Sequence, residues 1–292
     1  MSVLASRSSA PTSATSGLGR PFVLVTGGKG GVGKSTIAAN LAAVLGHAGA
    51  RPLLVDLDFG LANLDVLLGV DPDLRAGAYL RGEATVRDCL LDTPYRVTLL
   101  PAGSSAGEEP VAFDPPARER LLDGLRAVAP DHGVVVGDSA AGIGPEVLRF
   151  AALADRVLVV TTPEPAALTD AYGVVKALDH WAREHDLALP TPELFVNFAR
   201  DAEEAQRVVA GLRSACKRFL SRSPRLVGWM PRGRAVLRAI LAQRPFVVDA
   251  PNAPATRQLT RLAHRWVDGL LATAPAPIAP EKGSQALDGS DR

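Results

Sequence analysis

A glycine-rich segment with two lysines is the part of this sequence best suited to chemistry. It reads GGKGGVGKST from Gly27 to Thr36 and satisfies the spacing G-x-x-x-x-G-K-[ST] after an apolar run. Glycines permit the positive φ angles that turn backbone N–H groups to one side, and the start of a following helix adds positive charge. The segment therefore predicts a cradle for a polyphosphate. We expect nucleotide contacts from Gly28, Lys29, Gly30, Gly31, Val32, Gly33, Lys34, Ser35 and Thr36.

The charged and hydroxyl side chains of this loop have separable roles. Lys34 is expected to reach the β- and γ-phosphates, and the Ser35 hydroxyl to ligate Mg²⁺. Lys29 is a second cation inside the loop, next to where a tetra-anion would lie. A solvated lysine on a loop is the alternative for Lys29, whereas a turn that binds nothing needs neither the Lys-Ser pair nor the helix.

Three aspartates follow apolar runs that read as strands. Asp56 and Asp58 follow one run, and Asp138 ends another, Val134–Gly137. Ligands of open α/β sheets bind at the carboxyl ends of strands, so the three are expected to face the loop. Asp58 is a candidate for orienting the attacking water, and Asp56 and Asp138 for holding magnesium. Helix capping or loop hydrogen bonds are the alternative for Asp56 and Asp58. The small residues from Ser139 to Gly144 suit a switch loop.

Short β-branched or Leu-rich runs alternate with amphipathic stretches along the chain. This alternation predicts an α/β fold with a doubly wound, mostly parallel sheet and helices on both faces. We expect one domain over residues 21–272 and disordered tails over 1–20 and 273–292, which are rich in small and polar residues or proline. The expected strands, buried on both faces, are 22–26, 52–56, 96–100, 133–138, 156–161, 194–197 and 226–229. The expected helices are 35–47, 115–128, 166–184, 201–220, 234–243 and 255–271.

The base of the nucleotide can be predicted in part. A GTP-specific fold would carry Asn-Lys-x-Asp after a late strand, whereas this chain has Asn197 followed by Phe-Ala-Arg. ATP is therefore the expected nucleotide, with Mg²⁺. Asn197 could pair with the adenine edge, and a purely structural amide is the alternative.

Composition narrows the class of protein. In 292 residues, 47% are hydrophobic and the net charge is +1, which excludes disorder as the main state and favours neither a nucleic-acid nor a membrane partner. Residues 200–268 hold 14 basic and 5 acidic residues, so this end is basic. No apolar run or leader segment suggests export, and two isolated cysteines fit a reducing compartment, so a cytoplasmic protein is expected.

These residues together resemble the deviant Walker A ATPases of the MinD/ParA superfamily, whose signature lysine corresponds to Lys29. The segments Asp56–Gly69, Asp138–Ile143 and Thr162–Tyr172 look most like the FlhG/FleN (YlxH) branch, regulators of flagellar number and placement. The resemblance implies that ATP bridges a homodimer and that Lys29 contacts the phosphates of the opposite subunit. It further implies that Asp58 positions water and that the ATP dimer is the output. A monomer lacking its partner's lysine should hydrolyse ATP slowly.

The sequence also departs from that family. Pro231-Arg232-Gly233 stands where relatives place acidic residues near the base, and residues 1–20 lack the Asp-Gln-Ala helix through which many FlhG proteins stimulate an FlhF-type GTPase. Flagellar assembly, switch or regulator proteins are the partners implied. Weak contact with the inner membrane face through the last helix is an alternative to core packing of its apolar face.

Two other functions compete with the flagellar one. A DNA-partitioning ATPase would use the basic segment, although solvated helix faces explain its arginines equally well. Iron–sulfur scaffolds and reductases need cysteines between subunits near the switch loop, and Cys89 and Cys216 lie in amphipathic stretches away from Asp138. We therefore expect an ATPase switch.

Overall fold

The computed structural model of the protein describes residues 17–103 and 112–270. Most of the expected tails lies outside these residues. Residues 17–20, assigned to the first tail, differ from the expectation, because Leu18 is buried in the core and Arg20 donates to the Pro130 carbonyl at 2.8 Å. Ordered structure therefore begins before residue 21.

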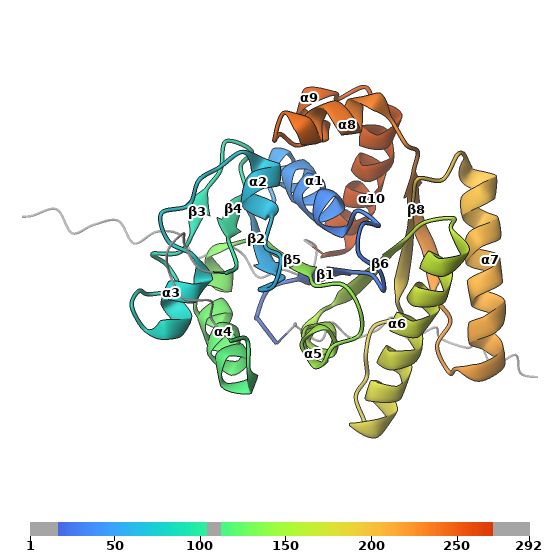
Figure 1. Cartoon of the computed structure of the whole chain (residues 1–292), viewed down its shortest axis with the longest axis horizontal. Coiled ribbons are helices and arrows are strands. Elements are labelled where there is room, and N and C mark those ends of the chain that lie inside the picture. The colour runs from blue at the N-terminus through green and yellow to red at the C-terminus, as the bar shows by residue number, and fades with distance from the viewer. Residues whose placement is uncertain (1–16, 104–111, 271–292) are drawn as a thin grey trace, which may run out of the picture.

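An eight-stranded sheet forms the centre of the described part of the chain (Figure 1). Every strand pair is parallel except β3 with β4, so the predicted α/β class with a mostly parallel sheet is confirmed. Across the sheet the order is β3 (Leu91–Asp92), β4 (Thr98–Leu100), β2 (Pro52–Leu57), β5 (Val134–Ser139), β1 (Phe22–Thr26), β6 (Arg156–Thr161), β7 (Glu193–Asn197) and β8 (Arg225–Met230).

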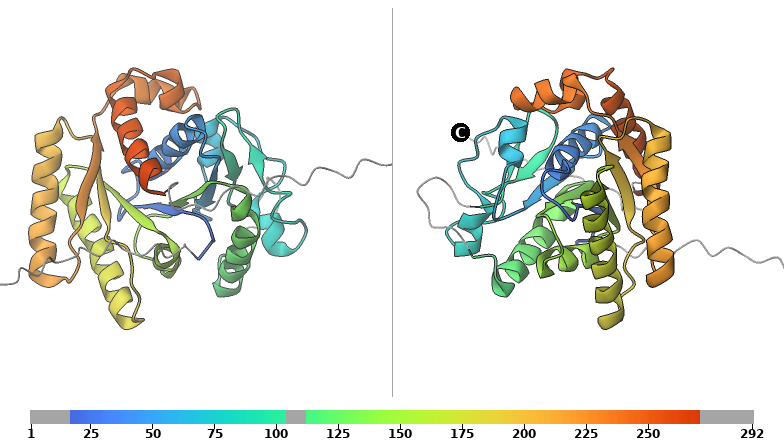
Figure 2. Two further views of the ribbon diagram at one scale, coloured as in Figure 1. Left: turned by 180° about the vertical axis from the view of Figure 1, so that it is seen from behind. Right: turned by 45° about the vertical axis from the view of Figure 1, so that its right-hand side comes forward.

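Helices cover both faces of the sheet (Figures 1 and 2). Side chains alternate along a strand, so Val23 and Val25 of β1 pack into one core, whereas Phe22 and Leu24 pack into the other. The first core includes α1 (Lys34–His47), α2 (Leu64–Leu68), α8 (Arg234–Leu241), α9 (Phe246–Asp249) and α10 (Pro254–Leu270). The second includes α3 (Ala76–Arg81), α4 (Pro115–Val128), α5 (Pro145–Leu153), α6 (Pro165–Glu184) and α7 (Ala202–Phe219).

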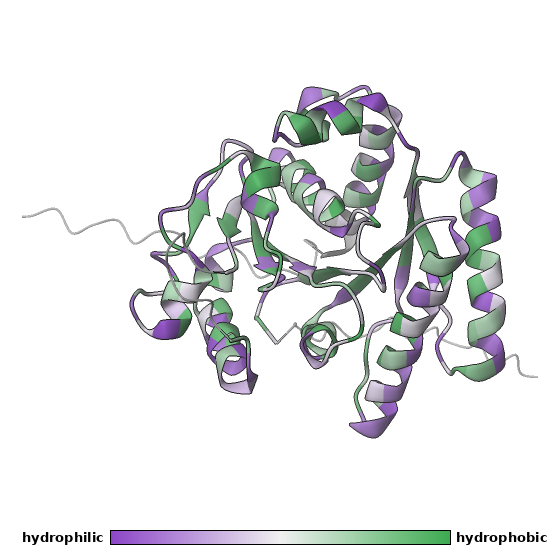
Figure 3. Ribbon diagram, viewed as in Figure 1, coloured by the Kyte–Doolittle hydropathy of each residue, from purple (hydrophilic) through white to green (hydrophobic). Residues whose placement is uncertain are grey.

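Hydropathy follows the layers (Figure 3), with mainly hydrophobic residues along the central strands. One expectation fails at the edge: β8 was expected to be buried on both faces, yet its residues are mostly half-buried, because only β7 pairs with it. Strand β4 begins at Thr98 and not at residue 96 as expected, because Arg96 has φ +59°, which an extended strand does not accommodate. The short elements β3, α2, α3 and α9, and the longer α5, were not expected.

The last helix packs into the core. Its apolar residues Leu259, Leu262, Ala263 and Trp266 are buried against α1 and β8, whereas Arg257, Arg261 and Arg265 are exposed. Core packing, the first of the two alternatives, is therefore what α10 does. These buried residues are not available for a membrane contact, and the side chains after Trp266 lie outside the described residues.

Candidate functional site

The glycine-rich loop connects β1 to α1 at the carboxyl edge of the sheet. Its backbone is compact: a Cβ added at Gly28 would lie 2.3 Å from the Asp170 carbonyl oxygen of α6. Gly33 has φ +94° and precedes the first residue of α1, so glycine is needed there as well. The loop therefore has a backbone that requires glycine at these positions, and it leads directly into α1.

Lys34 is the first residue of α1 and only 8% of its surface is exposed. Burial lowers the pKa of its ammonium group, while the nearby Asp138 and Asp58 oppose this effect. The Ser35 hydroxyl lies close enough to Asp138 to lower the pKa of that carboxyl, against the effect of burial. A desolvated cation and a hydroxyl are thus held together beside two carboxylates.

Asp138 ends the apolar part of β5, and its register partner on β2 is Asp56. Burial, followed by the charge of Asp56, raises the pKa of Asp138 to about 8. Asp138 is 1% exposed, and its Oδ1 has no hydrogen-bond partner in the described structure. A buried carboxylate oxygen without a donor beside a serine hydroxyl is the donor set that Mg²⁺ prefers, so these residues fit the ion.

Asp56 forms loop hydrogen bonds, and its role in the magnesium shell stays a prediction. Its Oδ1 accepts from the Asp58 N–H at 3.0 Å, and its Oδ2 from the Asn63 and Leu64 N–H groups at 3.2 and 3.4 Å. Burial raises its pKa to about 7, and these backbone hydrogen bonds oppose the rise. Asp56 therefore holds the loop after β2, which was the alternative for this residue.

Asp58 lies in the loop that Asp56 holds. Its Oδ1 accepts from the Gly60 and Leu61 N–H groups at 3.2 and 3.0 Å, and its charge attracts Lys34. The side chain is half-buried, so one carboxylate oxygen is fixed by the loop while the group remains open to solvent. This position fits a group that orients a water molecule next to Lys34.

Lys29 is the outermost charged group of the loop. Its Nζ lies 3.6 Å from Glu164 Oε2, and both side chains are about half exposed, at 43% and 54%. The other oxygen of Glu164 lies 3.9 Å from the Arg232 guanidinium. Glu164 follows β6 at the same edge of the sheet. Its role was not predicted from the sequence, although its place after a strand was a usable signal.

Asn197 lies under the phosphate loop, and its contact with adenine stays a prediction. Its side chain is buried, its Nδ2 donates to the Val32 carbonyl at 2.8 Å, and its Oδ1 accepts from the Phe198 N–H at 2.9 Å. It therefore supports the phosphate loop from β7, which corresponds to the structural amide that was the alternative.

An apolar pocket of about 480 Å³ lies beside this support, lined by Phe198, Pro231, Arg232, Val236, Leu237 and Ile240 among others. Phe198 has φ +62°, an unusual conformation for a bulky residue, and the Arg232 guanidinium lies 4.5 Å from the centre of its ring. Phe198 was not predicted from the sequence, in which the departure at Pro231-Arg232-Gly233 was the only indication of this pocket.

The loop between β5 and α5 touches the phosphate loop. The Gly142 N–H donates to the Gly27 carbonyl at 3.0 Å, and Ile143 next to it is 52% exposed. The segment expected to act as a switch therefore contacts the loop whose ligand it would sense.

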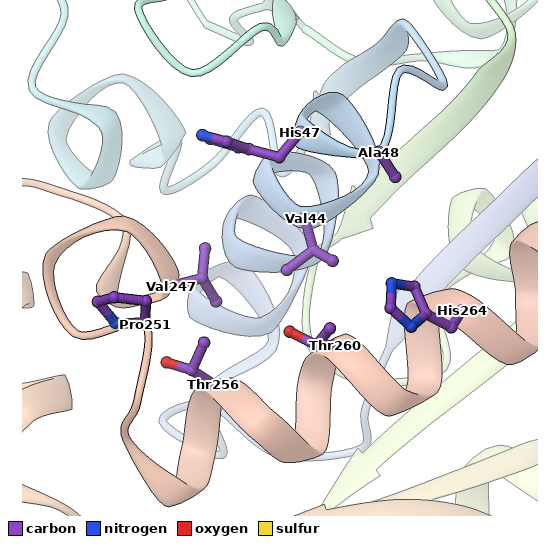
Figure 4. A pocket seen from close by; sticks show the side chains of 8 residues that line it. All are labelled: Val44, His47, Ala48, Val247, Pro251, Thr256, Thr260 and His264. Atoms are coloured by element: carbon purple, nitrogen blue, oxygen red, sulfur yellow. The ribbon is translucent and has the colours of Figure 1, made fainter.

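A second pocket, between α1, α9 and α10, has no such cluster of charge (Figure 4). His47 and His264 both line it, yet His47 points away from His264, and the Nδ1 of His47 bonds to the Ala43 carbonyl. Among the described residues no group of three His, Cys, Asp or Glu side chains could hold a metal, and no helix is long and apolar enough to cross a membrane.

Comparison with known proteins identifies the family. Residues 23–246 match the CobQ/CobB/MinD/ParA nucleotide binding domain. This chain belongs to that family. Antiactivator FleN of Pseudomonas aeruginosa is 35% identical over 258 residues, which cover 88% of each chain. The flagellum site-determining protein YlxH of Helicobacter pylori is 39% identical over 157 residues, covering 53% of this chain and 52% of YlxH. The resemblance to the flagellar branch is confirmed.

Solved structures agree on the fold. The cell division ATPase MinD of Pyrococcus furiosus superimposes with a TM-score of 0.68 at 24% identity, over 85% of this chain and 98% of MinD. The septum site-determining protein MinD of Pyrococcus horikoshii, complexed with Mg-ADP, gives 0.68 at 23% identity, over 87% and 99%. At this identity the likeness concerns the fold, which is that of MinD.

Proposed function

We propose that this chain is an ATP-dependent dimerisation switch that regulates the number or placement of flagella. The proposal rests chiefly on one observation: Ser35 lies with the buried Lys34 and Asp138 under a phosphate-type loop, in a chain similar to FleN over 88% of its length. MinD/ParA relatives are ATPases, which supports ATP hydrolysis as the underlying activity.

The phosphate loop would hold the triphosphate. Its N–H groups and Lys34 would bind the β- and γ-phosphate oxygens, and the partial burial of Lys34 strengthens this attraction because little water screens it. Lys34 would exchange its weak pairing with Asp138 and Asp58 for the phosphates. The cost of desolvating the ammonium, which these carboxylates oppose in part, would then be offset by the bound anion.

Ser35 and Asp138 would hold Mg²⁺, Ser35 directly through Oγ and Asp138 through its unpartnered Oδ1 or the ion's water molecules. The ion would supply positive charge to the phosphate oxygens of the transition state. Asp56 would act on this site indirectly, because its oxygens already hold the loop that carries Asp58.

The apolar pocket next to Asn197 would take the adenine base. Phe198 and Arg232 offer an aromatic face and a planar guanidinium, both of which stack on nucleobases. Asn197 then positions the neighbouring loop rather than reading the base. This replaces the predicted adenine contact with a shape-based one.

Two subunits would face each other across the nucleotides. Lys29 is exposed at the rim of the loop and held by the exposed Glu164, so it can leave this pair to reach the phosphates of a partner. Asp58 would orient the water whose oxygen bonds to the γ-phosphorus as the bond to the β–γ bridging oxygen breaks. A cation supplied in trans is worth about 10³–10⁵ in rate, so dimerisation would control turnover.

The flagellar role is supported by FleN and YlxH, whose names denote an antiactivator and a flagellum site-determining protein. The switch would act in the cytoplasm on flagellar assembly or regulator proteins, an FlhF-type GTPase among the candidates. A DNA-partitioning role has less support, since the basic segment is partly neutralised by ion pairs, as at Arg200, Arg207, Arg222, Arg225, Arg232 and Arg244.

Replacing Asp58 tests the switch. Asp58→Ala should bind ATP and stay dimeric, because the water is no longer oriented and the ATP state persists, whereas wild type returns to monomer as ATP is consumed. Multi-angle light scattering with Mg-ATP measures this. A variant that binds ATP and remains monomeric would exclude the dimer.

Deleting the gene and counting flagella tests the cellular role, and unchanged number and placement would contradict it.

A further inference from the structure

A second charged pocket lies at the opposite edge of the sheet from the phosphate loop. It has a volume of about 360 Å³, and it is lined by Arg156, Glu193 and Arg225, the first residues of β6, β7 and β8. Arg265 and Trp266 of α10 are also in its wall. Since the nucleotide site lies where these strands end, the two sites are separated by the length of the strands.

Glu193 neutralises part of the positive charge of the arginines that line this pocket. It is 2% exposed, and its Oε1 accepts from Arg156 at 2.6 Å and from Arg225, while its Oε2 accepts from Trp266 Nε1 at 3.1 Å. Both oxygens of the carboxylate are therefore in use. One carboxylate neutralises one guanidinium, so the lining retains an excess of two positive charges.

Glu193 is the only acidic side chain among the described residues that line the pocket. Arg265 donates to the carbonyl of Val227, the residue displaced by the irregular pairing of β8 with β7, and Arg225 is 61% exposed. The Nε of Arg156 is buried with no acceptor among the described residues. Asp155, the residue before Arg156, does not line the pocket; its carboxylate accepts from the Phe22 N–H and also attracts Arg156 from outside the pocket.

We propose that this pocket binds the dianionic phosphate group of a small phosphorylated ligand. Guanidinium groups match phosphate oxygens with paired N–H donors, and an excess of two charges matches a phosphate monoester at neutral pH. Trp266 is 2% exposed, so its ring offers no stacking surface and the charged group is what the pocket recognises. The pocket does not depend on the nucleotide site or on its proposed function.

Titration with inorganic phosphate tests the proposal on the full chain. A Lys34→Ala background removes the main cation of the phosphate loop, and the ¹⁵N-labelled arginine Nε–H signals report on each guanidinium by NMR. We expect saturable shifts of the Arg156, Arg225 and Arg265 signals with a Kd on the order of 1 mM. Arg225→Gln should weaken binding about tenfold, while Arg156 still pairs with Glu193 and keeps the protein folded.

Arg261→Gln is the matched control, since Arg261 is exposed one turn earlier on α10 and does not line the pocket; its phosphate affinity should match the parent. The proposal is overturned if no saturable shift occurs up to about 20 mM phosphate. It is also overturned if Arg225→Gln binds as tightly as Arg261→Gln, or if acetate, a monoanion, binds as tightly as phosphate. A melting temperature for each variant verifies folding.

Discussion

The two edges of the sheet place a buried carboxylate in opposite surroundings. Asp138 at the carboxyl edge is 1% exposed and Glu193 at the amino edge is 2% exposed. Glu193 receives hydrogen bonds from two guanidinium groups and an indole. Asp138 has one oxygen without a partner among the described residues, and its pKa is raised to about 8. Burial is the same, and the difference lies in the partners.

This contrast separates a carboxylate that stabilises the fold from one that is available to bind a ligand. A buried carboxylate that is surrounded by donors fixes the strands that carry them, while one without donors is held at the expense of stability until a ligand arrives. Strands β6 and β7 run from one of these edges to the other. Their first residues, Arg156 and Glu193, stabilise the fold, and the residues that follow the last residue of each strand lie near the phosphate loop.

The largest effect should follow from breaking the amino edge. Glu193→Ala leaves Arg156 and Arg225 without their carboxylate and should lower the free energy of unfolding by about 3 kcal/mol. Urea denaturation followed by circular dichroism measures the loss. Glu184→Ala, at the exposed end of α6, is the control and should change stability by less than about 0.5 kcal/mol. Equal effects would mean that the Glu193 cluster adds nothing to stability.

The buried aspartates at the carboxyl edge should make the stability of the protein depend on pH. The pKa of Asp138 is raised from 3.8 to about 8 and that of Asp56 to about 7, so the folded chain binds more protons than the unfolded chain between these values. The stability of the ligand-free protein should therefore fall as pH rises from about 4 to about 8.

Asp138→Asn removes one of these two groups and should make the fall shallower, as measured by urea midpoints at several pH values. Asp123→Asn, on the surface of α4, should leave the slope unchanged. If Asp138→Asn follows the wild-type curve, the carboxylate is not destabilised by its surroundings.

The smallest effect should come from the exposed pair at the rim. Glu164→Gln removes the partner of Lys29, and an exposed ion pair holds the lysine by about 0.2–1 kcal/mol, so ATP turnover should rise no more than about fivefold. Initial rates of phosphate release measure it, with Glu184→Gln as the control. A lower rate would mean that Glu164 assists the reaction instead of restraining Lys29.

Local patterns predicted the parts of the site that depend on neighbours in sequence. The glycine spacing gave the loop, and apolar runs gave the strands that end near Asp58 and Asp138. The hydrogen bonds of Asp56 and Asn197 were not predictable in this way. Asn197 supports Val32 across 165 residues of sequence, and Glu164 meets Lys29 only because β1 and β6 are neighbours in the sheet. Such pairings follow from the order of the strands in the sheet, and the alternation of strands and helices along the chain does not determine that order.

Complementation between two inactive variants tests the central claim most directly. Lys29→Ala keeps Asp58 but cannot assist its partner, and Asp58→Ala keeps Lys29 but cannot orient water. In a mixed dimer one site receives both groups, so an equimolar mixture should recover about one quarter of the wild-type ATPase rate, with half of the dimers mixed and one of two sites active. A mixture no faster than its two components measured separately would contradict the sharing of Lys29 between subunits.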